Sequence, residues 1–249
     1  MSDWKQKRFW TNVGVAEVDG GFAVQLDGRG VKTPAKAPLN VPTKVLADAI
    51  AAEWDAQEGV VNPNLMPFTR SANASIDKVM IQHGEVADML AAYGDADLLC
   101  YRATDPIELV ERQSEKWDPV LAWAASELDA TLMTRQGIMH LPQDEKPLKL
   151  LSDRTHALTA YELAAFHDLV SLSGSLILGF ATAYGYEPVD ELWNKSRLDE
   201  LWQEEQWGPD EEAQALSDVK KVAFWHAKRF FDASQIACRK DTNSGFVQT

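Results

Sequence analysis

The sequence predicts an α+β protein, with a small N-terminal antiparallel β domain followed by a larger, mainly α-helical domain. Residues 8 to about 34 alternate apolar and polar side chains between glycine-rich turn signals, which is typical of β-hairpins. From residue 43 onward, apolar residues recur three and four positions apart, which is typical of helices packed on a core. With 249 residues, 45% of them hydrophobic, the chain can bury a full core without metals or disulfides.

The expected β domain covers residues 1–42. Asp19-Gly20-Gly21 and Asp27-Gly28 separate the apolar runs and supply the positive φ values that tight hairpin turns need. The alternating apolar positions are Val13, Val15, Val18, Phe22, Val24 and Leu26. We therefore expect a small antiparallel sheet that ends near Pro42.

The expected helical domain covers residues 43–249, with a polar C-terminal tail that frays from about residue 238. Thr43 can cap a first helix that runs to about Gln57. Further helices are expected at about 68–92, 106–129, 145–158, 160–185, 188–206 and 211–235. The segment 131–141 could be extended. The small residues within 169–186 suit a buried central helix that neighbours approach closely.

The charge balance limits the classes of partner. The chain has 24 Lys and Arg against 38 Asp and Glu, a formal net charge of −14. Such a charge repels phosphate backbones and anionic lipids, so we expect no nucleic-acid or membrane partner. The two cysteines, Cys100 and Cys238, form neither a disulfide framework nor a metal pair, and we expect two inert thiols in a reducing, intracellular compartment.

Known catalytic motifs are absent from the sequence. It contains no P-loop, no dinucleotide-binding glycine motif, no nucleophile elbow and no zinc-protease motif. We expect no cofactor and no metal. An enzyme stays open as an alternative, with Glu53 or the pair Asp95 and Asp97 as acid and base and Arg70 as an anion holder. Turn or capping roles after Gly94 are the simpler interpretation of the two aspartates.

Glu53 falls in the middle of the apolar stripe of the first expected helix. An unpaired buried carboxylate costs several kcal/mol, so it needs a partner. Arg29 and Arg70 are candidates for an internal ion pair. A functional role as an acid in a cleft, or as a contact to a binding partner, is the alternative.

The segment from Glu187 to Asp218 concentrates the negative charge, with 11 acidic residues against Lys195 and Arg197. On one continuous helix its two apolar clusters would face opposite ways. Either the helix breaks near Ser196 or lies between neighbours, or the second face is a docking surface. The carboxylates that would rim this surface are Glu204, Glu205, Asp210, Glu211 and Glu212.

Several strings, in this order and spacing, resemble the assembly chaperone of the alpha subunit of the F-type ATP synthase catalytic head. They are Leu26-Asp27-Gly28-Arg29, Leu39-Asn40-Val41-Pro42, Ala49 to Gln57, Met66-Pro67-Phe68-Thr69-Arg70, Tyr93 to Arg102 and Gln206-Trp207-Gly208. The similarity extends from about residue 8 to 235. Pro209 departs from the usual pattern and is expected to break the helix and to start the last helix near Asp210.

The resemblance implies a non-catalytic chaperone that binds the free alpha subunit, prevents its aggregation and is replaced by the beta subunit, without nucleotide hydrolysis. A structural accessory subunit is a further alternative. The implied client-binding region is the acidic C-terminal one: Trp202, Glu204, Glu205, Trp207, Asp210, Glu211 and Glu212. Because the motifs start within ten residues of Met1, we expect a bacterial, cytoplasmic member, or a mitochondrial matrix protein if the chain is a mature eukaryotic form.

Overall fold

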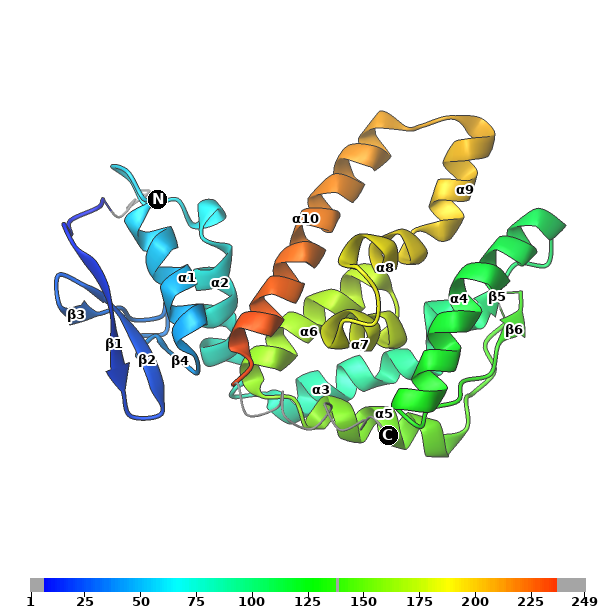
Figure 1. Ribbon diagram of the computed structural model, residues 1–249, viewed down its shortest axis with the longest axis horizontal. Coiled ribbons are helices and arrows are strands. Elements are labelled where there is room, and N and C mark those ends of the chain that lie inside the picture. Colours follow the sequence, from blue (N-terminus) through cyan, green and yellow to red (C-terminus); the bar gives the residue numbers. More distant parts are fainter. Residues whose placement is uncertain (1–6, 138, 237–249) are drawn as a thin grey trace, which may run out of the picture. The chain divides into compact units, whose positions relative to one another are not determined.

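The computed structural model describes residues 7–137 and 139–236 and confirms the α+β fold class (Figure 1). The chain divides into two compact units. Among the described residues, unit 1 comprises 7–81 and 230–236, and unit 2 comprises the described part of Gln82–Arg229. The division expected from the sequence, at residue 42, separates the sheet from all helices, whereas the contacts group the sheet with the first two helices.

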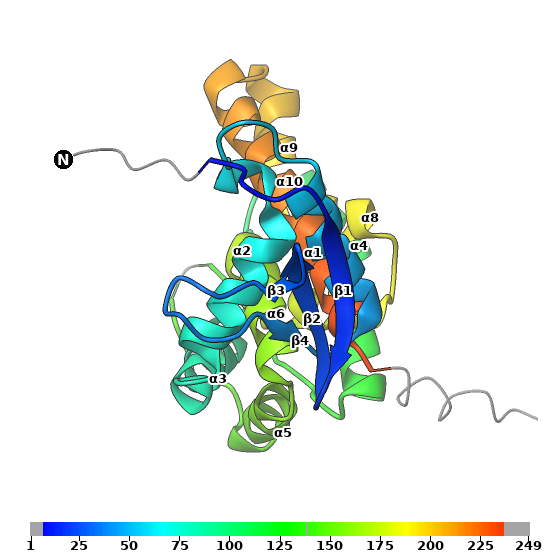
Figure 2. The same cartoon turned by 90° about the vertical axis from the view of Figure 1, so that its left-hand side faces the viewer.

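The sheet of unit 1 is antiparallel, as predicted (Figure 2). Strands β1 (Val13–Val18) and β2 (Gly21–Leu26) form a hairpin in which Val13 lies opposite Leu26. Two short strands, β3 (Arg29–Gly30) and β4 (Asn40–Val41), both pair with β2. A Cβ on Gly21 would lie 2.3 Å from the carbonyl oxygen of Val41, so the close approach of β2 to β4 at this point requires glycine.

Helix α1 (Lys44–Asp55) packs on β1 and β2 and buries Leu46, Ala47 and Ile50. The hydroxyl of Thr43 accepts the backbone N–H of Leu46 at 3.1 Å, which is the predicted cap. After the 3₁₀ turn Pro63–Leu65, helix α2 (Pro67–Ala74) continues into the π-helical turn Ser75–Val79.

Unit 2 contains the buried centre that the small residues predict. Eight of the nine residues of helix α7 (Leu176–Tyr184) are buried, and a Cβ on Gly179 would lie 2.6 Å from Cγ2 of Val170 on helix α6 (Ala160–Ser173). The elements of unit 2 that precede these two helices are α3 (His83–Ala91), η3 (Ala92–Ala96), η4 (Leu98–Cys100), β5 (Tyr101–Arg102), α4 (Ile107–Glu127), β6 (Arg135–Gln136) and α5 (Glu145–His156).

Three of the expected helices, over 68–92, 160–185 and 188–206, are interrupted. The helix expected over 68–92 breaks at residues 80–82, between the π-turn and α3. The helix expected over 160–185 breaks at Gly174, which has a φ of +70° and ends α6. Among the described residues of 131–141, only Arg135–Gln136 forms a strand. The tail expected to fray from 238 lies outside the described residues.

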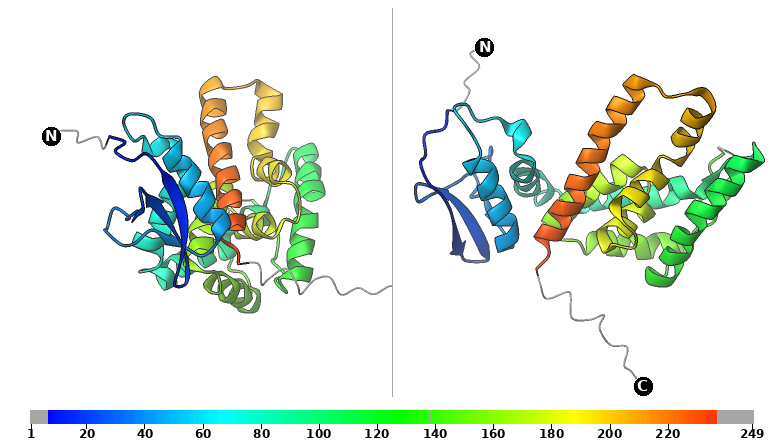
Figure 3. Two further views of the ribbon diagram at one scale, coloured as in Figure 1. Left: turned by 60° about the vertical axis from the view of Figure 1, so that its left-hand side comes forward. Right: turned by 45° about the horizontal axis from the view of Figure 1, so that its top comes forward.

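The helix expected over 188–206 breaks as well, at Arg197, next to the predicted Ser196. The pieces are α8 (Val189–Ser196) and α9 (Leu198–Trp207), and α10 (Glu211–Ser234) follows. Gly208, with a φ of +90°, and Pro209 end α9, as predicted. Both panels of Figure 3 show α9 and the first turns of α10 extending beyond the other helices of unit 2.

Candidate functional site

A groove of about 560 Å³ lies between α4 and the pair α8 and α9, all within unit 2. Its apolar lining comes from α9: Leu198, Leu201 and Trp202. Its charged lining comprises Glu108, Glu111, Arg112, Glu115, Lys116, Glu191, Lys195 and Glu205. The groove therefore combines an apolar wall with five carboxylates and three cations.

The three cations of the groove are already paired. Arg112 donates to Glu205 at 2.9 Å, Lys116 to Glu115 at 2.9 Å, and Lys195 to Glu187 at 2.5 Å. In the part of the chain that the structure describes, no cation lies within ion-pair distance of the remaining groove carboxylates, Glu108, Glu111 and Glu191. The groove is left with an excess of negative charge.

Arg112 connects α4 to α9. Its guanidinium lies over the ring of Trp202, 4.7 Å from the ring centroid, while it also bonds Glu205. The hydrogen bond between them lowers the pKa of Glu205 from the ordinary value of a glutamate and raises the pKa of Arg112 from the ordinary value of an arginine. Two predicted client-binding residues, Trp202 and Glu205, therefore have structural contacts within the chain.

The acidic residues around Pro209 differ in their availability. Asp210 accepts the backbone N–H groups of Glu212 and Ala213 at 2.9 and 3.1 Å, so its carboxylate caps α10. Among the described residues, no cation pairs with Glu204, Glu211 or Glu212. Trp207, at the end of α9, is 79% exposed. The structure thus leaves Trp207, Glu211 and Glu212 exposed and Glu204 partly exposed.

The break at Arg197 explains how the two opposed apolar clusters are accommodated. Val189, Leu192 and Trp193 of α8 are buried, and so is Leu198 at the start of α9. Leu201, one turn later, is 37% exposed. The expected break of the helix is therefore confirmed, and the second piece of the segment still exposes apolar side chains.

The first half of α10 is a feature that the sequence analysis missed. The second half of α10 packs on α8. The ring of Phe224 is buried against Trp193, and the carboxylate of Asp190 accepts from both Lys221 and Trp225. No residue from Glu211 to Val222 is buried. Leu216, Val219 and Val222 are 57%, 67% and 70% exposed.

Glu53 has a structural partner in unit 1. Its carboxylate accepts the backbone N–H groups of Phe68 and Thr69 at 2.6 and 2.8 Å and the hydroxyl of Thr69 at 2.7 Å. A negative charge at the start of α2 is favourable because the first N–H groups of a helix lack internal acceptors. The side chains expected to pair with it, Arg29 and Arg70, are both exposed.

Asp97 is fully buried in unit 2. It accepts the backbone N–H groups of Leu99 and Ile177 at 3.0 Å each and the hydroxyl of Ser175 at 2.7 Å. Burial raises the pKa of Asp97 to about 6, although these hydrogen bonds lower it in part. The side chain therefore caps both η4 and the start of α7.

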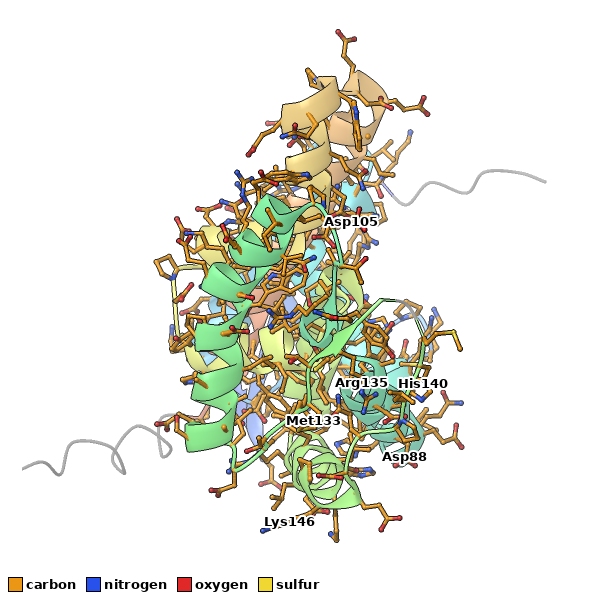
Figure 4. All side chains as sticks on the ribbon, turned by 90° about the vertical axis from the view of Figure 1, so that its right-hand side faces the viewer. Asp88, Asp105, Met133, Arg135, His140 and Lys146 are labelled. Carbon is orange, nitrogen blue, oxygen red and sulfur yellow. The ribbon has the colours of Figure 1, made fainter. Side chains whose placement is uncertain are left out.

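Asp95 belongs to a separate cluster at the segment between β6 and α5. It accepts the backbone N–H of Gln143 at 2.6 Å and lies 3.3 Å from Nε2 of His140. The other ring nitrogen of His140 lies 3.0 Å from the hydroxyl of Tyr101. Figure 4 shows His140 on this segment, near Arg135 of β6. Asp95 and Asp97 thus serve different local structures.

Other chemical features are sparse across residues 7–137 and 139–236. No group of three or more His, Cys, Asp and Glu side chains is arranged to hold a metal ion there. In the same residues, no helix combines the length and the apolar character that crossing a bilayer requires. Burial raises the pKa of the Cys100 thiol to about 12, which makes it unreactive, and Cys238 lies outside the described residues.

Comparison with known proteins places these features in a family. Residues 7–125 match the family described as the ATP12 chaperone protein. The chain is 28% identical over 224 residues to "Protein atp12, mitochondrial" of Schizosaccharomyces pombe, covering 85% of this chain and 77% of that protein. Two solved structures of Paracoccus denitrificans Atp12 are 46% identical to this chain and cover 94% of it and all of their own chains. The TM-score is 0.91 for a crystal structure of the protein and 0.92 for an aspartate-to-lysine mutant.

Proposed function

Because the chain belongs to the ATP12 chaperone family, we propose that it binds the unassembled alpha subunit of the F-type ATP synthase catalytic head. It prevents aggregation of this subunit and passes it to the beta subunit. The 46% identity to a bacterial protein supports action in a bacterial cytoplasm. Membership of the family supports a role in ATP synthase assembly, and we propose the alpha subunit as the client and the beta subunit as the protein that receives it.

The exposure of the end of α9 and of the start of α10 is the observation that carries this proposal. Trp207 is 79% exposed, and Glu204, Glu211 and Glu212 lie close to it in the sequence. Large exposed aromatic side chains are typical anchors of protein interfaces. Carboxylates around an apolar contact favour a partner with basic residues and keep the complex soluble.

We propose that the client is released by displacement. No nucleotide-binding motif is present, so hydrolysis within this chain cannot drive release. A competitor that buries the same client surface more completely lowers the free energy of the client and takes the place of the chaperone. The beta subunit is the proposed competitor.

Size-exclusion chromatography with purified subunits tests the handover. The chain is expected to co-elute with the alpha subunit without ATP and to return to its free elution volume when the beta subunit is added. Retention in the alpha–beta assembly would instead identify an accessory subunit. No co-elution with the alpha subunit at micromolar concentrations would overturn the proposal.

The enzyme alternative receives little support from the geometry. The carboxylates that it requires are each engaged locally: Glu53 at the start of α2, Asp95 by Gln143 and His140, and Asp97 by Leu99, Ser175 and Ile177. A general acid or base must reach a proton on the substrate, and Asp97 is fully buried. We therefore argue the function from the exposed surface of α9 and α10.

A further inference from the structure

The first half of α10 carries an apolar stripe on a helix with no buried residue from 211 to 222. At 100° per residue, Ala215, Leu216, Val219, Val222 and Ala223 fall within about 120° of one another. This is the width of a face that normally packs on a core. Here it spans about 13 Å along the helix axis and lies in solvent.

Charged residues on one side of the stripe are acidic. Glu211 and Asp218 fall beside it on the same 100° count, and Glu212 lies at its N-terminal end. Lys220 lies beyond the opposite edge, and Lys221 is held by Asp190 at 2.9 Å. A helix packed on the stripe is therefore favoured when it carries Lys or Arg next to its own apolar face.

We propose that this stripe binds an amphipathic helix of the client, about three turns long, with basic residues along one edge of its apolar face. This inference rests on the proposed function and identifies the part of the chain that covers the client. Trp207 and the glutamates near it then contact the parts of the client that lie next to that helix. The exposed apolar side chains provide the binding energy, and the acidic flank sets the orientation.

Three glutamine substitutions test the stripe. The variant Leu216→Gln, Val219→Gln and Val222→Gln removes its apolar character, and glutamine is a better helix former than valine, so α10 is expected to stay folded. Val45→Gln is the matched control, because Val45 is 66% exposed on α1 of unit 1. Circular dichroism and urea unfolding show whether both variants keep the fold.

The readout is the concentration of chain that halves the aggregation of the alpha subunit, measured by light scattering. The triple variant is expected to need at least tenfold more protein, whereas the Val45→Gln variant matches the unmodified chain. Equal protection by the triple variant would overturn the stripe as the docking site and leave the proposed function standing. Absence of protection by the unmodified chain would overturn the proposed function and this inference together.

Two further measurements test the occupant. Glu211→Lys with Asp218→Lys is expected to weaken protection at low salt, and Glu17→Lys with Glu58→Lys, which carries the same charge change on exposed residues of unit 1, is not. Equal effects of the two pairs would contradict a basic edge on the client helix. A concentration-dependent dimer that the triple glutamine variant abolishes would show that a second copy of the chain covers the stripe, and would contradict the proposal.

Discussion

The guanidinium of Arg112 lies 4.7 Å from the ring centroid of Trp202 and links α4 to α9. The same guanidinium donates to Glu205, one turn further along α9. α9 exposes Leu201 and Trp207, and the Arg112 contact helps to hold this helix on α4, together with the hydrogen bond from Gln113 to Asp199 at 2.7 Å. It therefore positions the exposed end of α9 that the proposed function uses.

Replacing Arg112 is expected to loosen α9. In Arg112→Ala the stack on Trp202 is lost, which contributes on the order of 0.5–1 kcal/mol at an exposed site. Hydrogen exchange of the α9 amides should become faster, because the helix opens locally without global unfolding. Arg29→Ala, at an exposed arginine of β3, is the control. Unchanged exchange in α9 would contradict a positioning role for Arg112.

Asp97 is expected to make the free energy of unfolding of the chain depend on pH. Burial raises its pKa to about 6 in the folded chain, against 3.8 for an aspartate exposed to water. The folded state thus binds a proton more tightly, so this group stabilises the fold below pH 3.8 and the stabilisation is lost as pH rises to about 6. The rise in pKa corresponds to about 3 kcal/mol.

The measurement is the free energy of unfolding in urea between pH 4 and 7 for the unmodified chain and Asp97→Asn. The variant should lose this decrease with pH and be less stable throughout, because an amide nitrogen replaces one acceptor of the N–H groups of Leu99 and Ile177. Asp144→Asn, at an exposed residue, should keep the original profile. Parallel pH profiles of the unmodified chain and Asp97→Asn would refute this origin.

Glu53 is expected to stabilise unit 1 through the start of α2. In Glu53→Ala, the N–H groups of Phe68 and Thr69 and the Thr69 hydroxyl lose their acceptor, and the loss should be about 2–3 kcal/mol. Glu58→Gln, at an exposed residue in the same unit, should change the free energy of unfolding by less than about 0.5 kcal/mol. A Glu53→Ala chain with the stability of the control would show that the carboxylate is not the cap of α2.

The acidic residues near Trp207 are expected to act on association rates. Reversing Glu204, Glu211 and Glu212 to Lys should slow binding of the alpha subunit about tenfold or more at low salt and weaken its salt dependence. Asp210 and Glu205 are left unchanged, because they cap α10 and pair with Arg112. Stopped-flow tryptophan fluorescence at several salt concentrations measures the rates, and identical rates would place the client contact elsewhere.

The sequence predicts local structure here better than it predicts partners. The turn signals Asp19-Gly20-Gly21 place the hairpin, and Pro209 places the start of α10, because both act through the geometry of their own backbone. The breaks at Gly174 and Arg197 are harder to locate because the apolar spacing continues on both sides of each. Periodicity alone cannot separate one bent segment from two helices.

The exposure of α10 illustrates the same limit. Leu216, Val219 and Val222 recur three residues apart, as residues of a core-facing helix do, although on a count of 100° per residue Val222 lies about 160° from the buried Phe224. Whether a face is buried depends on a neighbour that lies far away in the sequence or in another chain. The role of Asp210 as a cap is local in principle, and its position just before α10 is the signal that could have identified it.

The central claim is that this chain holds the alpha subunit without nucleotide, and light scattering tests it most directly. Freshly unfolded alpha subunit is diluted into buffer without ATP, with and without an equimolar amount of the chain. The account predicts that scattering is suppressed at a ratio of about one to one and that adding the beta subunit then yields assembled complex. Scattering that is unchanged by the chain at equimolar and higher ratios would contradict it.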